Sequence, residues 1–178
     1  MAVPLFVLSV IVGLLLAETR LSRTHEARLR ARGALAPPGD VYVALAVAYP
    51  AAFIAMGLEG MARRTTPEGL FASGVLMFVA SKALKYWAIG ALGERWSFRV
   101  LVLPGLPLVS TGPYRYVAHP NYVAVVGELV GTAMMMNARL SGPIALCVFG
   151  AILWLRIRFE TKALRKAYEK IEASALRC

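Results

Sequence analysis

Long uncharged runs alternate with short polar segments along the chain, and this pattern predicts helices that cross a membrane. Five apolar segments stand out, at residues 1–17, 41–58, 69–92, 120–137 and 142–155. A spanning helix needs about 20 residues, with a range of ~17–25. The second segment meets this length directly, and the others meet it with short polar extensions. We therefore expect an all-α integral membrane protein with about five transmembrane helices.

The boundaries of these segments carry residues that typically begin helices. Asp40 follows a Pro-Pro-Gly stop and is a candidate N-cap of the second helix. Thr66-Pro67-Glu68 opens the third segment and His119-Pro120 opens the fourth, each with a proline in the first turn. The short turn at 137–142 predicts that the fourth and fifth helices are antiparallel neighbours.

The loop at residues 93–119 differs from the other connections. Residues 96–103, with the sequence WSFRVLVL, are rich in aromatic and β-branched types, and Pro104-Gly105 follows as a turn signal. We expect a short β-hairpin-like loop against the membrane face before the fourth helix.

Composition supports the membrane interpretation. The chain is 58% hydrophobic and 17% charged, with a mean hydropathy of +0.62, whereas a soluble domain has about half apolar and a quarter charged residues. The net charge of +10 suits either nucleic acid or an anionic membrane surface. Because the basic stretch at 20–32 directly follows an apolar segment, we expect membrane lipids as its partner and no nucleic acid.

The distribution of basic residues predicts the orientation. With five spans and an external N-terminus, the cytoplasmic segments 18–40, 93–119 and 156–178 hold fifteen Lys and Arg residues, and the external loops hold three. This asymmetry follows the positive-inside rule. The first segment is not expected to be a signal peptide, because its positive charges follow the apolar run. We therefore expect the N-terminus outside and the C-terminus in the cytoplasm.

Polar and aromatic residues gather in two segments, GPYRYVAHPNYVAVVGE at 112–128 and RIRFE at 156–160. Ionisable residues at membrane depth are costly and indicate functional sites. Glu128 lies eight residues after Pro120, about 12 Å into the helix, on the same face as Asn121. We expect this face to line a pocket open to the cytoplasm. The alternative for Glu128 is a helix-packing hydrogen bond.

The remaining charged candidates have structural alternatives. His119 precedes the fourth helix, where backbone N–H groups can bind an anion, but it can also act only as a cap. Arg156 and Glu160 are four residues apart and can pair on one helix face, although a basic collar also explains the arginine. Lys82 and Lys85 are interpreted as snorkelling to the interface. With two histidines and no metal-binding motif, no metal site is expected.

Together, the two segments resemble the isoprenylcysteine carboxyl methyltransferase family of integral membrane enzymes. Its pattern is G-P-Y, then Arg-His-Pro-x-Tyr, a Gly and Glu further on, and a Glu-Glu motif after the last span. The run KYWAIGALGERWSFRVLVLPGLPLVSTGPYRY is similar to the bacterial branch. Two positions depart from the pattern, because Ala118 replaces the Arg before His and Thr161 replaces the second Glu.

The resemblance implies a methyltransferase that binds S-adenosylmethionine from the cytoplasm and methylates a lipophilic or prenylated acceptor from the bilayer. We treat 1–178 as one membrane domain, with N-terminal spans at 1–68 and a cofactor-binding catalytic half at 69–178. The expected cofactor-binding residues are Tyr114, His119, Pro120, Asn121, Tyr122 and Glu160. The expected catalytic residues are Glu128, Arg115 and Arg156. An arginine would hold an acceptor carboxylate, whereas a phenol acceptor would need a base such as His119 or Glu128.

Two other functions compete with this one. Membrane sterol reductases carry a similar His-x-Asn-Tyr pattern and use NADPH, but their adjacent Gly-Asp is absent here, since Glu128 lies six residues after Tyr122. The second alternative is a non-enzymatic membrane factor, which would bind no cofactor.

Overall fold

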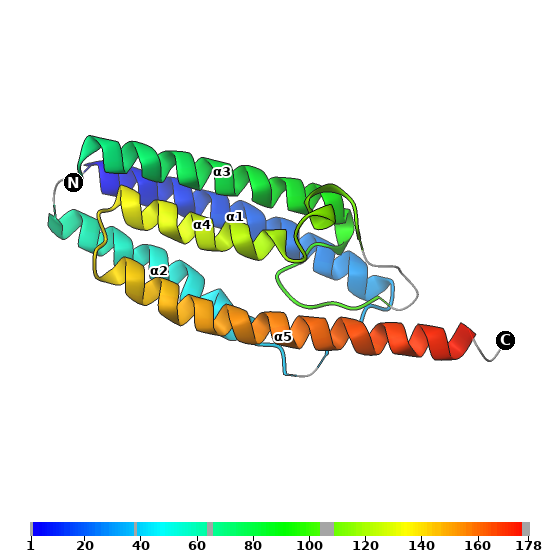
Figure 1. The fold of residues 1–178 in the computed structure, drawn as a ribbon. Coiled ribbons are helices and arrows are strands. Elements are labelled where there is room, and N and C mark those ends of the chain that lie inside the picture. The colour runs from blue at the N-terminus through cyan, green and yellow to red at the C-terminus, as the bar shows by residue number, and fades with distance from the viewer. Residues whose placement is uncertain (1, 38, 64–65, 104–108, 176–178) are drawn as a thin grey trace.

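The computed structural model describes residues 2–37, 39–63, 66–103 and 109–175, with side chains to residue 161. The chain forms an antiparallel bundle of long helices (Figure 1). The helices are α1 (Ala2–Ala31), α2 (Tyr42–Arg63), α3 (Glu68–Leu92), α4 (Pro120–Met135) and α5 (Ser141–Ala175), with short 3-10 helices η1 (Gly93–Arg95) and η2 (Gly112–Arg115). The predicted all-α fold is therefore confirmed, and each apolar segment lies in its own helix.

Four helices are long and apolar enough to cross a membrane, namely α1, α2, α3 with its extension to Arg95, and α5 over Ser141–Thr161. The fifth predicted span, α4, has 16 residues, which is below the range of ~17–25 for a spanning helix. It ends at Met135, just before Asn137, whose φ of 49° is a left-handed conformation that breaks the helix. In this structure, helix lengths support four spans and a shorter fifth helix.

Helices α3 and α4 pack backbone against backbone, side by side in Figure 1. A Cβ on Gly131 would lie 2.8 Å from the carbonyl oxygen of Gly74, and one on Gly74 would lie 2.7 Å from that of Gly131. Because glycine has no side chain, the two backbones approach more closely than any other residue allows. Gly127, one turn earlier on α4, lies equally close to Ser81 of α3, where a Cβ would meet the Ser81 hydroxyl.

One carboxylate joins the end of α2 to the start of α5. Glu59 accepts hydrogen bonds from the backbone N–H of Leu140 at 3.2 Å and of Ser141 at 2.7 Å, and from the Ser141 hydroxyl at 2.7 Å. Acceptors at a helix N-terminus satisfy N–H groups that have no partner within the helix. The short α4–α5 turn is thereby fixed, and the predicted antiparallel pairing of these helices is present (Figure 1).

The predicted β-hairpin is not found among the described residues, and its turn at 104–105 lies outside them. Val102 instead pairs with Leu35, in the α1–α2 connection, through two hydrogen bonds of 3.0 Å. Trp96 is buried, with 2% of its surface exposed, and its carbonyl oxygen lies 2.9 Å from Nδ1 of His25 on α1. The loop therefore docks on the end of α1, because its hydrogen-bond partners come from the N-terminal part of the chain.

Candidate functional site

The first motif segment, residues 112–128, is held against the end of α3 by a glycine. Gly112 has φ +60°, and a Cβ there would lie 2.9 Å from the Cβ of Ala91. Glycine adopts this left-handed conformation without a steric penalty. Because Gly112 begins η2, its contact with α3 sets the position of Tyr114 and of the residues that lead into α4.

The fourth helix begins at His119-Pro120, as predicted. His119 occupies the N-cap position, but its side chain makes no capping hydrogen bond. Its ring stacks on that of Tyr122, with ring centroids 5.4 Å apart and an interplanar angle of 24°. The imidazole is therefore placed beside the aromatic residue of the motif, and the alternative that His119 acts only as a cap has no capping hydrogen bond to support it.

Tyr122 joins the two motif segments. Its hydroxyl donates a hydrogen bond to the carboxylate of Glu160 and accepts one of 3.2 Å from Nε of Arg156. Tyr114 lies near the same carboxylate, and its burial together with the Glu160 charge raises the pKa of its phenol well above the usual value. Four of the predicted residues therefore meet at one place, namely His119, Tyr122, Arg156 and Glu160, and Tyr114 is close enough for the Glu160 charge to act on its phenol.

Arg156 is buried, with 3% of its surface exposed, and its partner differs from the predicted one. Its guanidinium forms an ion pair with Asp40 and donates a 2.7 Å hydrogen bond to the carbonyl oxygen of Phe98. The predicted pairing of Arg156 with Glu160 is wrong. The guanidinium donates to Asp40, Phe98 and Tyr122, so it holds these three parts of the site together.

Asp40 was expected only as an N-cap. Its Oδ1 does accept a 3.1 Å hydrogen bond from the backbone N–H of Tyr42, and its Oδ2 accepts one of 3.2 Å from that of Val100. The ion pair with Arg156 is the connection that the sequence did not reveal, because the two residues lie 116 positions apart. No local pattern marks such a pair.

Two predicted residues remain without a partner in the described part of the chain. The side-chain oxygen of Asn121 is buried, and no described group donates a hydrogen bond to it. Arg115 lies exposed at the end of η2 and forms no ion pair with a described residue. An unpartnered buried acceptor is costly unless a ligand or water donates to it.

Glu128 lies in a separate, fully buried cluster. Its carboxylate accepts a 2.5 Å hydrogen bond from the hydroxyl of Tyr49 and lies 2.9 Å from Nζ of Lys82 and 3.2 Å from Nζ of Lys85. Only 1% of its side chain is exposed. The expected pocket-facing position of Glu128 is therefore replaced by one that faces two lysines.

The same lysines pair with Glu18 of α1. Nζ of Lys82 lies 2.6 Å and Nζ of Lys85 lies 2.7 Å from the Glu18 carboxylate. The interpretation of these lysines as snorkelling is wrong, because their side chains are 9% and 1% exposed. The three-residue spacing of Lys82 and Lys85 was the sequence signal for a shared acidic partner, since residues three apart lie on one helix face. We call Glu18, Lys82, Lys85 and Glu128 the charge cluster.

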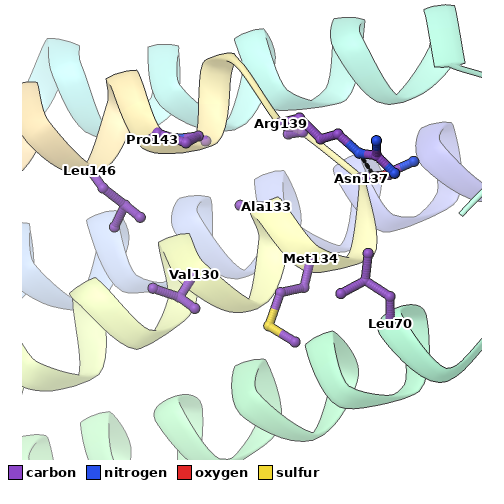
Figure 2. A pocket seen from close by; sticks show the side chains of 10 residues that line it. Leu70, Val130, Ala133, Met134, Asn137, Arg139, Pro143 and Leu146 are labelled. Carbon is purple, nitrogen blue, oxygen red and sulfur yellow. Dashed lines mark hydrogen bonds between the residues drawn. The ribbon is translucent and has the colours of Figure 1, made fainter. Parts of the chain in front are cut away.

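Two cavities lie away from the motif residues. One, of about 290 Å³, is lined by α3, α4, α5 and the turn between the last two, where Arg139 donates a hydrogen bond to Asn137 (Figure 2). The other is an apolar groove of about 590 Å³ between α1 and α3 that reaches Lys82 and Tyr86. Among the described residues, no group of His, Cys, Asp and Glu could hold a metal ion.

The model of the isoprenylcysteine carboxyl methyltransferase family matches residues 74–166, more than half of the chain. The chain belongs to this family. The matched region includes all the residues that meet around Tyr122 except Asp40. Family membership, together with the apolar helices, indicates an integral membrane methyltransferase.

Two bacterial relatives are similar over most of their length. A Bacillus subtilis protein, YpbQ, is 27% identical over 154 residues, covering 84% of this chain and 89% of the relative. A Haemophilus influenzae protein is 25% identical over 151 residues, covering 84% and 88%. Both relatives are named as uncharacterized proteins. No solved structure matches the chain.

Proposed function

We propose that this member of the isoprenylcysteine carboxyl methyltransferase family is an S-adenosylmethionine-dependent enzyme that O-methylates a lipophilic acceptor at the cytoplasmic membrane face. The observation that carries the proposal is the contact of Tyr122 with Glu160, which joins motif segments 38 residues apart into one site. Both segments lie within the family match.

The polar groups around Tyr122 suit a cationic ligand. The carboxylate of Glu160 is an acceptor beside Tyr122, and S-adenosylmethionine offers a sulfonium cation and amino donors. Asn121, the residue before Tyr122 in the chain, has a buried side-chain oxygen to which no described group donates. The stacked rings of His119 and Tyr122 add an aromatic surface beside them. When bound, this cofactor supplies an electrophilic methyl group. We assign Tyr114, His119, Pro120, Asn121, Tyr122 and Glu160 to its binding.

The acceptor determines which further groups are needed. A carboxylate acceptor is already nucleophilic, so positioning is the main task of the protein. We assign Arg115, exposed at the end of η2, to hold that carboxylate. A phenol acceptor needs a proton acceptor, which the imidazole of His119 can provide. The acceptor class is therefore a lipid-like acid, a prenylated cysteine carboxylate or a phenol, and it enters from the bilayer.

The orientation follows from where the charges lie relative to the site. Exposed arginines extend along the last part of α1, at the same end of the bundle as η2 and the start of α4 (Figure 1). They are Arg20, Arg23, Arg28 and Arg30 on α1 and Arg32 directly after it. Basic segments beside spans remain in the cytoplasm. We propose a bacterial inner-membrane protein with an external N-terminus and a cytoplasmic active site.

Calorimetric titration of the detergent-solubilised protein with S-adenosylhomocysteine tests the proposal. We expect binding by the wild type, and a tenfold or greater loss of affinity in His119→Ala and Glu160→Ala, since a hydrogen bond to a charged group is worth about 1.5–3 kcal/mol. Glu94→Gln, which removes exposed ion pairs with Arg28 and Arg32, is the control and should bind normally. Binding of NADPH instead would support a reductase, and binding of neither would support a non-enzymatic factor.

A further inference from the structure

We propose that Asp40 is a positioning residue, which holds Arg156 away from Glu160 and thereby keeps the Glu160 carboxylate available to the cofactor. This inference rests on the proposed function, because it assumes that Glu160 contacts S-adenosylmethionine. Asp40 lies before the region matched by the family model, which begins at residue 74.

Arg156 and Glu160 are four residues apart on α5, a spacing at which opposite charges normally pair. In this structure they do not pair. The guanidinium instead directs one nitrogen to Asp40, one to the Phe98 carbonyl and its Nε to the Tyr122 hydroxyl. Glu160 receives its hydrogen bond from Tyr122 and not from the arginine.

A buried guanidinium requires an acidic partner, because an unpaired charge away from water is costly. Asp40 is the acidic partner of Arg156 in this structure. Its side chain is 12% exposed, and backbone N–H groups of Tyr42 and Val100 fix its two oxygens. The carboxylate is therefore in place without any movement of α5.

Loss of this carboxylate would redirect the arginine. The nearest acid on its own helix is Glu160, one turn further along α5. An Arg156–Glu160 pair would neutralise the carboxylate and displace the Tyr122 hydroxyl from between them. Asp40 thus controls the charge of a binding site to which it makes no direct contact.

The test is S-adenosylmethionine binding by calorimetry in the full-length protein, with four variants. We expect Asp40→Asn to bind about tenfold or more weakly, and Asp40→Glu, which keeps the charge, to bind within about threefold of the wild type. The decisive variant is the double substitution Asp40→Asn/Arg156→Gln, because it removes the redirected cation. We expect it to bind at least about threefold more tightly than Asp40→Asn alone. Glu94→Gln is the matched carboxylate control.

A purely structural role for Asp40 predicts that the affinity of each variant follows its fraction of folded protein, because removing both partners of a buried ion pair can restore stability. Binding is therefore measured well below the unfolding midpoint of each variant, where a redirected arginine still weakens binding and a purely structural defect does not. Wild-type affinity in Asp40→Asn, or no recovery in the double variant, would overturn this inference alone. Failure of the wild type to bind would overturn the proposed function and this inference together. If Asp40→Asn does not fold, the double variant still decides, because it leaves no unpaired cation: binding supports the inference and loss of binding overturns it.

Discussion

Glu128 on α4 and Lys82 on α3 form a buried ion pair, with 2.9 Å between carboxylate oxygen and ammonium nitrogen. Lys85 and Glu18 complete the charge cluster, so that two acids and two bases neutralise each other. Tyr49 adds a hydrogen bond from α2. The cluster therefore links four helices, and the charges that appear isolated in the sequence are paired in space.

Replacement of Glu128 by Gln should lower the thermal stability of the protein. It leaves two ammonium groups with one carboxylate, and breaking a buried ion pair costs about 3–5 kcal/mol. The double variant Glu128→Gln/Lys82→Met should recover most of this loss, because Glu18 and Lys85 remain paired at 2.7 Å. The unfolding midpoint in detergent measures both effects.

The same pair of variants decides between the two roles of Glu128. If its carboxylate takes part in methyl transfer, the double variant will be stable but inactive. If it serves only the charge cluster, activity will return along with stability. Equal stability of Glu128→Gln and the wild type would contradict the pairing itself.

Removal of the Tyr122 hydroxyl should weaken cofactor binding without unfolding the site. Tyr122→Phe keeps the ring that stacks on His119 but loses the hydrogen bonds to Glu160 and from Arg156. We expect about a tenfold lower affinity for S-adenosylhomocysteine. Tyr116→Phe is the control, because that side chain is 73% exposed, and it should bind normally.

A methyl group at the α3–α4 contact should destabilise the bundle. In Gly131→Ala the new Cβ would lie 2.8 Å from the Gly74 carbonyl oxygen, which forces the backbones apart at a cost of about 1–3 kcal/mol. Gly150→Ala adds the same methyl group where no atom lies within 4 Å, so its unfolding midpoint should stay the same or rise. Equal midpoints for the two variants would show that α3 and α4 are not in close contact.

The orientation is tested by cysteine labelling in intact cells. In a background of Cys147→Ser and Cys178→Ser, a cysteine at Glu68 should react with a membrane-impermeant maleimide, and one at Arg30 should react only after permeabilisation. Both positions are exposed and lie at opposite ends of the bundle. The reverse pattern would place the site outside.

Local patterns predicted the features of this protein that depend on neighbouring residues. The His119-Pro120 pair located the start of α4, since proline restricts its own backbone. The short polar break after the fourth apolar segment located the turn before Ser141. The motif segments also predicted that Tyr122 and Glu160 belong to one site, although here the family resemblance supplied the connection that spacing alone does not.

Distant partners account for what the sequence did not predict. Val102 pairs with Leu35 and not within a hairpin, and Lys82 points at Glu18, 64 residues earlier, and not at the interface. Arg156 pairs with Asp40 and not with Glu160, which is nearer in sequence, because the α1–α2 connection places a fixed carboxylate beside the guanidinium. Each of these contacts depends on how helices assemble, which no pattern within one segment encodes.

Helix α5 is attached to the rest of the protein at two points, so the number of residues between them determines where its side chains lie. Glu59 accepts hydrogen bonds from Ser141 in its first turn, and Asp40 forms an ion pair with Arg156, fifteen residues further along. Each residue of a helix advances about 1.5 Å and turns by about 100°. Insertion or deletion of one residue between these two contacts would rotate both Arg156 and Glu160 away from Tyr122. The length of this stretch of α5 is therefore as important for the site as the side chains themselves.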